Sequence, residues 1–455
     1  MSSHALRKFS FAAGFAAALL AYALPAHAQG IGLLRDTETE EMLKSYEAPL
    51  ARAAGLDPDA VKTYLVGDPM INAFAMQPAN IFICAGMLLW LRVPNELIGV
   101  MAHETGHISG AHLTRGSYGA KKAMIPMLAS IVLGLGAMVA GAGELGMVMM
   151  GLGQAVAEAQ FATFTRVQES SADQIAAKLL LATRQSPMGM YNTFRRFATA
   201  DAMHSVYYRP DRFASSHPVG QDRVFDLNQK VEASPYREVQ DSPQTLHTFR
   251  MVQAKLAGFV LPVKDALTRY PVSDNSAPAR YARSFTYMRQ PDFQKALAEI
   301  SSLIREEPNN PYFYEVRGQI QVSMAKPALA LADYQKSVSL RPNAPQLRLA
   351  LAGAQLAIED QNLAAEALKN LKAALLVEND DIFTWYQTAR AYAALKNVPM
   401  ADLSTAELWY NVGDMRRALV FATRARGKLT QGSPDWERAQ DIIGAAGPLA
   451  AQQRG

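Results

Sequence analysis

Two segments in the C-terminal half of this 455-residue chain align without a gap at an offset of 34 residues. The matched positions are Ala296, Ile300, Leu303 and Pro308 in the first segment and Ala330, Tyr334, Ser337 and Pro342 in the second. Their spacing marks one face of a helix, and each segment ends in a Pro-Asn turn. Because a helix pair of this length buries its apolar face against the next one, the pattern predicts a stacked helical array.

The repeat length is that of tetratricopeptide (TPR) repeats, and we expect residues 280–450 to form an α-solenoid of such helix pairs. A third unit, around residues 352–379, matches only with a few extra residues, and a fourth covers about residues 401–427. An array of other helical hairpins is the alternative. Stacked helix pairs curve into a groove that usually binds peptides or proteins, so we expect this domain to recruit a protein partner.

The N-terminus predicts export. A positive pair, Arg7 and Lys8, precedes an apolar run, and the residues up to Ala28 form a small-x-small cleavage site. We therefore expect residues 1–28 to be a signal peptide cleaved after Ala28, with the mature protein in the periplasm. An uncleaved membrane anchor is the alternative.

Charge and cysteine content exclude several kinds of protein. The formal net charge is only +4, which gives no electrostatic basis for binding nucleic acid. The single cysteine, Cys84, excludes an intramolecular disulfide framework and a Cys-rich zinc module. We expect Cys84 to be buried and inert at the end of a strand.

Residues 29–240 mix helix and strand signals and are expected to form a first domain. Residues 38–54 show the periodicity of an amphipathic helix, and residues 62–66 and 80–84 show that of strands. Pro94 opens a further helix, which we expect to continue through His112. The overall fold class is therefore mainly α with a small β-sheet.

The sequence His103-Glu104-Thr105-Gly106-His107 in this helix matches the pattern H-E-x-x-H. The i, i+4 spacing places both imidazoles on one helix face, where they can bind the same zinc ion. Glu104, one step round the helix, can take a proton from a metal-bound water. Two ordinary helix histidines are the alternative.

A catalytic zinc needs a third protein ligand. Glu169 and Asp173 lie in the next helical polar segment, again at i, i+4 spacing. Glu169 can serve as a ligand, and Asp173, one turn later, can accept a hydrogen bond from a ligand imidazole. A solvated helix face is the alternative for this pair.

Together these motifs resemble the gluzincin-type endopeptidases, and more closely the HtpX-like and CAAX-prenyl-protease-like metallopeptidase family. The resemblance is carried by H-E-x-x-H, the later E-x-x-x-D, residues 72–75, Gly86, residues 95–97 and His112. It implies one zinc ion per chain on His103, His107 and Glu169, with Glu104 as the general base.

The resemblance also assigns a role to His217, which lies in the segment Ser215-Ser-His-Pro218. Two roles stay open: a donor to the oxyanion of the reaction, or a fourth zinc ligand that keeps the enzyme latent. A structural hydrogen bond in a loop is the further alternative. Arg223 is expected to support the same loop, and His112 to be structural.

Residues 119–160 are expected to form an apolar helical hairpin within the first domain. The run from residue 123 to residue 143 has no charge and is long enough to span a bilayer. We expect the hairpin to flank the substrate cleft and to make peripheral membrane contact through residues 123–157. A membrane-spanning hairpin, and thus an integral membrane protease, is the alternative. Residues 241–279 are expected to link the two domains.

Signal peptide, peptidase domain and TPR repeats together resemble the periplasmic branch of the family. This resemblance implies a zinc metalloendopeptidase that acts in the assembly and quality control of outer-membrane β-barrel proteins. Its partners would be unfolded or stalled outer-membrane proteins and, through the TPR groove, the outer-membrane assembly machinery. A chaperone or scaffold with a latent or regulatory zinc site is the alternative from another functional class.

Overall fold

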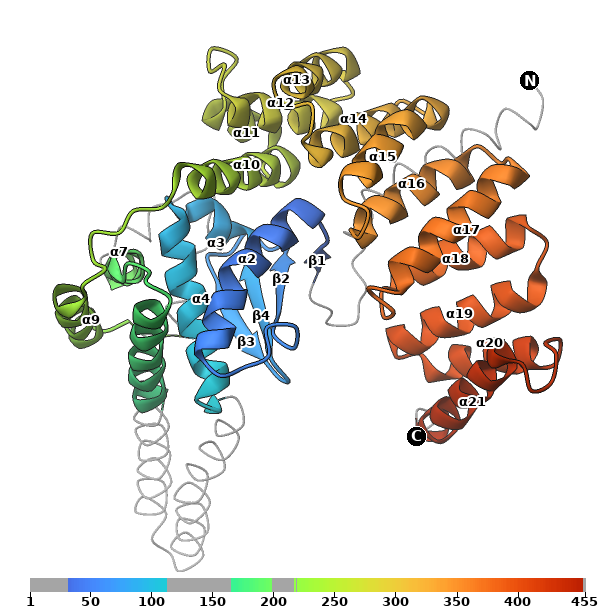
Figure 1. Ribbon diagram of the computed structural model, residues 1–455, viewed down its shortest axis with the longest axis horizontal. Coiled ribbons are helices and arrows are strands. Elements are labelled where there is room, and N and C mark those ends of the chain that lie inside the picture. Colours follow the sequence, from blue (N-terminus) through green and yellow to red (C-terminus); the bar gives the residue numbers. More distant parts are fainter. Residues whose placement is uncertain (1–31, 113–164, 199–216, 218, 453–455) are drawn as a thin grey trace, which may run out of the picture. The chain divides into compact units, whose positions relative to one another are not determined.

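The computed structural model describes residues 32–112, 165–198, 217 and 219–452 (Figure 1). The predicted signal peptide and the predicted hairpin over residues 119–160 lie outside these ranges. The chain divides into two compact units, one ending at Leu256 and the other beginning at Ala257. A small sheet and its helices lie in the first unit, and the described part of the second consists of helices, which confirms the expected fold class. Among the residues described, no helix combines the length and apolar character that crossing a membrane requires.

The sheet of the first unit has four strands in the order β1-β2-β4-β3. They are β1 (Leu33–Leu34), β2 (Lys62–Val66), β3 (Ala73–Met76) and β4 (Asn80–Cys84). β2 and β4 run parallel, while β1 and β3 are antiparallel to their neighbours. The two strands predicted from the sequence are confirmed with the same bounds. β3 is an edge strand, since its outer side pairs with no other strand of the described chain.

Helix α2 (Thr37–Ala53) packs against both the sheet and helix α4 (Pro94–Ser109). It begins at Asp36, whose side chain accepts a hydrogen bond from the backbone N–H of Thr39 and so caps the helix. Asp36 also forms an ion pair with Lys255. The apolar side of α2 is buried, as its amphipathic pattern predicted.

Helix α4 follows the short helix α3 (Ala85–Trp90) and is buried from Pro94 to His107. Pro94 occupies the first turn, as predicted. The prediction that this helix continues through His112 is wrong, because α4 ends at Ser109 and Gly110 closes it. Ala111 has a φ of 54°, which interrupts the helical path and turns the chain before His112.

Three further helices follow in the described part of this unit before residue 241. They are a helix over residues 165–182, α7 (Met188–Ala198) and α9 (Gln221–Ala233). α7 packs against α4 and α9. Two glycines of α4 allow close contacts with this group, because a Cβ on Gly99 would lie 2.7 Å from Met190 and one on Gly106 would lie 2.8 Å from the carbonyl oxygen of Ala172.

The segment predicted as a linker, residues 241–279, contains helices α10 (Pro243–Val260) and α11 (Val263–Arg269). Gln253 on α10 donates hydrogen bonds to the carbonyl oxygens of Leu88 and Leu91. Nearer its end, α10 is capped by Arg289, which donates to the carbonyl oxygens of Gly258 and Leu261. The predicted linker is therefore helical over much of its length.

Five helix pairs follow, coloured yellow to red in Figure 1. The first helices of the pairs are α12 (Ala277–Arg289), α14 (Pro311–Ser323), α16 (Pro345–Ala357), α18 (Ile382–Ala394) and α20 (Met415–Arg426). Their partners are α13 (Phe293–Glu306), α15 (Pro327–Leu340), α17 (Gln361–Leu375), α19 (Val398–Val412) and α21 (Pro434–Gln452).

The period of the array is the one predicted. α12, α14 and α16 begin 34 residues apart, and the extra residues expected in the third unit lie in α17 and in the loop between α17 and α18. Ala296, Ile300 and Leu303 are buried, as are Ala330, Tyr334 and Ser337 at the matching positions of the next pair. The TPR array is thus confirmed, with the repeated small and apolar residues forming the contacts between successive helices.

Candidate metal centre

His103 and His107 lie on the buried side of α4, one helical turn apart. Their Nε2 atoms are 3.1 Å from each other, and the two rings meet edge to face. His103 is 0% exposed and His107 is 7% exposed, so neither imidazole is solvated on an open helix face. A solvated position on the helix is therefore wrong for both histidines.

The helix over residues 165–182 brings two carboxylates to these imidazoles. Glu169 Oε2 lies 3.3 Å from His103 Nε2, and Glu169 Oε1 lies 3.3 Å from His107 Nε2. Asp173, one turn later, places Oδ1 3.0 Å from His103 Nδ1. Both acidic residues are buried, so the solvated-face alternative is wrong as well. With Nδ1 of His103 directed at Asp173, the Nε2 lone pair faces the centre of the cluster.

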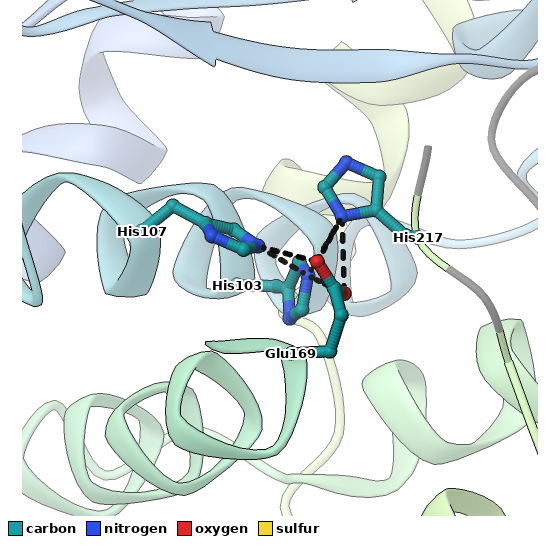
Figure 2. Close-up of side chains that lie close together, drawn as sticks. All are labelled: His103, His107, Glu169 and His217. Carbon is teal, nitrogen blue, oxygen red and sulfur yellow. Dashed lines mark hydrogen bonds and ion pairs between the residues drawn. The ribbon is translucent and has the colours of Figure 1, made fainter. Parts of the chain in front are cut away.

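His217 comes from a distant part of the sequence and joins the same cluster, as Figure 2 shows. Its Nδ1 lies 3.1 Å from Glu169 Oε2 and 3.3 Å from His103 Nε2. One ligand atom from each of His103, His107, Glu169 and His217 lies within 4.8 Å of the others, and this group could hold a metal ion.

Glu104 adjoins the cluster from α4. Its side chain is 0% exposed, and neither carboxylate oxygen has a hydrogen-bond partner among the residues that the structure describes. The other ring nitrogen of His217, Nε2, lies 3.6 Å from Glu104 Oε1. His217 therefore faces the group of nitrogen and oxygen donors with one nitrogen and Glu104 with the other.

Arg223 binds the two carboxylates of the cluster. Its guanidinium donates to both oxygens of Asp173, at 2.8 and 2.9 Å, and lies 3.1 Å from Glu169 Oε2. These contacts join Arg223 to the helix over residues 165–182. The segment before His217, which Arg223 is predicted to support, lies outside the described residues. This bidentate geometry orients Asp173 toward His103.

Burial and charge perturb the pKa values of these groups in opposite directions. Burial alone would raise the pKa of Asp173, but His103 and Arg223 outweigh this effect and lower it. Burial would likewise raise the pKa of Glu169, and its three histidine neighbours lower it well below the usual range. The pKa of His107 is lowered, chiefly by burial, which favours the neutral imidazole that a metal requires.

Phe194 belongs to the surroundings of the site and was not predicted from the sequence. Phe194 on α7 packs its ring edge to face against His103, at 5.2 Å between centroids, and Arg223 lies over the same ring. No spacing in the sequence connects Phe194 with the histidines. His112 lies behind the donor group, with Nδ1 3.1 Å from His107 Nδ1, and Cys84 is buried in β4 with its pKa raised to about 12 by burial.

Comparison with known proteins agrees with this geometry. Residues 37–231 match the model of Peptidase family M48. The chain is 25% identical to the β-barrel assembly-enhancing protease of Escherichia coli (strain K12) over 390 residues, which cover 82% of this chain and 77% of that protein. It is 24% identical to the protein of the same name from Yersinia pestis over 415 residues, covering 88% and 82% of the two chains.

A solved structure is also similar to part of the chain. It is the crystal structure of YrrB, described as a TPR protein with an unusual peptide-binding site. The TM-score is 0.31 at 21% identity, and the match covers 38% of this chain and 89% of YrrB. The family match and the relatives confirm the predicted resemblance and, with it, a metalloprotease.

Proposed function

We propose that this protein is a zinc endopeptidase of the periplasm, because its residues 37–231 match the model of Peptidase family M48. We further propose that it acts in the assembly and quality control of outer-membrane β-barrel proteins, maturing some clients and degrading stalled ones. The printed name of its relatives, β-barrel assembly-enhancing protease, supports this role. The observation on which the proposal rests most is the buried group of three imidazoles and one carboxylate.

The spacing of the donor atoms supports zinc. Ligands about 2.0–2.1 Å from a tetrahedral ion lie roughly 3.3 Å from one another. The donor atoms of His103, His107 and Glu169 are separated by 3.1 and 3.3 Å, and His217 Nδ1 lies at similar distances. A cation among these buried nitrogen and oxygen atoms would satisfy their lone pairs. Imidazole and carboxylate are also the donors that zinc accepts.

The proposed reaction uses the residues around this donor set. When bound, zinc would supply Lewis-acid chemistry, polarising the scissile carbonyl and lowering the pKa of a water. Glu104 takes the proton of the attacking water and passes it to the leaving amine, so that the amine departs neutral. Asp173 holds His103 through Nδ1, and Arg223 holds Asp173, so both act as positioning residues.

His217 keeps the two roles that the sequence left open. Its Nδ1 lies among the donor atoms, which supports a fourth ligand that closes the site and keeps the enzyme latent. In the other role, the imidazole moves aside when substrate binds and donates a hydrogen bond to the oxyanion. The two roles predict opposite effects of removing the ring.

The edge strand β3 is the proposed substrate-binding strand. It packs against α4, the helix that carries Glu104, and its outer side pairs with no strand of the described residues. An unassembled β-barrel client exposes unpaired strands, and one of them can add to such an edge through backbone hydrogen bonds. We propose that the TPR array recruits these clients or the assembly machinery, and that residues 123–157 contact the membrane surface.

The substitution Glu104→Gln tests the proposed function. The amide keeps the size of the side chain but cannot accept a proton, so cleavage of casein and of a β-barrel client should fall by about 10²–10⁴-fold. Zinc content, measured by elemental analysis, should stay at one ion per chain. Cleavage that persists in zinc-free wild-type protein would refute the zinc-dependent reaction. Client maturation that survives in the variant would favour the chaperone or scaffold.

A further inference from the structure

Glu47 is a buried carboxyl group that the proposed reaction does not use. It lies on α2, 2% exposed, where this helix packs against α4. Its Oε1 lies 2.9 Å from the hydroxyl oxygen of Thr105, and its Oε2 has no hydrogen-bond partner in the described part of the chain. Thr105 directly follows Glu104 and lies between His103 and His107 in the sequence. Glu47 thus contacts the helical turn that carries the proposed site.

The hydroxyl of Thr105 faces two acceptors but has only one hydrogen. Besides Glu47 Oε1, it lies 2.7 Å from the carbonyl oxygen of Met101, one turn earlier on α4. A carbonyl oxygen cannot donate, so the single hydrogen of Thr105 satisfies Met101 only if Glu47 supplies the hydrogen of the other bond. Both short contacts are accounted for when Glu47 is protonated, and one of them is left without a hydrogen when it is ionised.

Electrostatics support the protonated form. A buried carboxylate requires donors or a cation, and within the described residues no lysine, arginine or histidine forms an ion pair with Glu47. Burial raises the pKa of Glu47 to about 8, although the bond with Thr105 lowers it, and the charge of Glu104 across the interface raises it further. Of these two buried carboxyl groups, Glu104 faces the donor cluster where a cation would bind, and Glu47 faces a hydroxyl.

We propose that Glu47 is a neutral carboxylic acid in the folded protein and that it donates its proton to Thr105. This hydrogen bond fixes the turn of α4 that presents Glu104 and the two histidines. Glu47 is therefore a positioning residue, which acts through Thr105. Its effect on catalysis rests on the proposed function, whereas its protonation state does not.

Infrared difference spectroscopy tests the protonation state without any reaction. The spectrum of metal-free wild-type protein minus that of Glu47→Gln should contain, at pH 6, the carbonyl band of a protonated carboxylic acid. The band should fade as the pH rises through about 8. A difference spectrum that shows an ionised carboxylate at pH 6 would overturn the proposal. Because no peptide is cleaved, this result does not depend on whether the protein is a protease.

Kinetics of two variants test the positioning role. Glu47→Gln keeps a neutral donor to Thr105, so kcat should stay within about threefold of wild type, and activity should persist to higher pH. Glu47→Leu removes the donor, so kcat should fall about 10- to 100-fold with little change in KM, as expected for a misplaced catalytic turn. Glu41→Gln, at an exposed position of the same helix, is the matched control and should follow the wild-type pH profile.

The two variants distinguish positioning from simple packing. A Gln variant as impaired as the Leu variant, or one with an unchanged pH profile, would refute the positioning role. If the Leu variant does not fold, the pH profile of the Gln variant decides by itself. If wild-type protein cleaves no peptide, the proposed function is refuted. The infrared experiment still decides independently whether Glu47 is protonated.

Discussion

Gly106 lies between His103 and His107 in the sequence, at the point where α4 meets the helix over residues 165–182. A Cβ at this position would lie 2.8 Å from the carbonyl oxygen of Ala172 and 3.2 Å from its Cα. Both atoms belong to the backbone and cannot rotate away. The substitution Gly106→Ala therefore requires the two helices to separate by roughly 0.5–1 Å, which restores ordinary contact distances.

Two energies act on the stability of this variant. Overpacking of a filled contact lowers the free energy of unfolding by about 1–3 kcal/mol. The higher helix propensity of alanine raises it by about 1 kcal/mol. We expect the metal-free protein to lose up to about 2 kcal/mol of unfolding free energy. The larger effect should be on metal binding, because His103 and His107 lie on one helix and Glu169 on the other. Misplacing ligands by this amount should weaken zinc affinity about 10- to 100-fold or more.

Competition with a chromophoric chelator measures the affinity, and urea unfolding with and without zinc measures the stability. A 100-fold loss of affinity should remove about 2.7 kcal/mol of the stabilisation that bound zinc gives. Gly444→Ala is the matched control, since a Cβ there meets nothing within 4 Å. The free energy of unfolding of this control should rise by up to about 1 kcal/mol through helix propensity, and its zinc affinity should equal that of wild type. Gly106→Ala protein with zinc affinity within about threefold of wild type would refute the reasoning.

Two further predictions concern His217 and the ion pair of Asp36. His217→Ala should raise peptidase activity if the ring is a fourth ligand that keeps the site closed, and should lower kcat about 10²–10³-fold if the ring is an oxyanion donor. Steady-state kinetics on a client peptide distinguish the two roles. An unchanged rate would exclude both. Burial alone would raise the pKa of Asp36, but Lys255 and Thr39 lower it below its ordinary value of 3.8. The ion pair therefore stabilises the fold above that pH, and its contribution is lost as the pH falls through the lowered pKa. Lys255→Met should lower the free energy of unfolding by about 2–3 kcal/mol at pH 7, less than the loss of a fully buried pair because both side chains keep some exposure. The loss should become smaller once Asp36 is protonated. Urea unfolding at pH 7 and pH 3 measures it, and an equal loss at the two pH values would refute the prediction.

Local periodicity let the sequence predict the elements of this protein and several residues of its site. An i, i+4 spacing places two side chains on one helix face whatever the rest of the chain does, so His103 with His107 and Glu169 with Asp173 were paired correctly. The same holds for β2 and β4, whose short apolar runs are strands, and for the TPR array, whose 34-residue period repeats one helix pair.

Contacts between distant segments were decided by the tertiary structure alone. Only packing brings His217 to Glu169, directs Arg223 at two carboxylates and places Phe194 against His103. The Gly106 contact and the Glu47–Thr105 bond likewise depend on how closely two helices approach, and no spacing within one helix specifies a distance to another. The sequence determined which side chains share a face, and the packing of those faces determined the chemistry available to them.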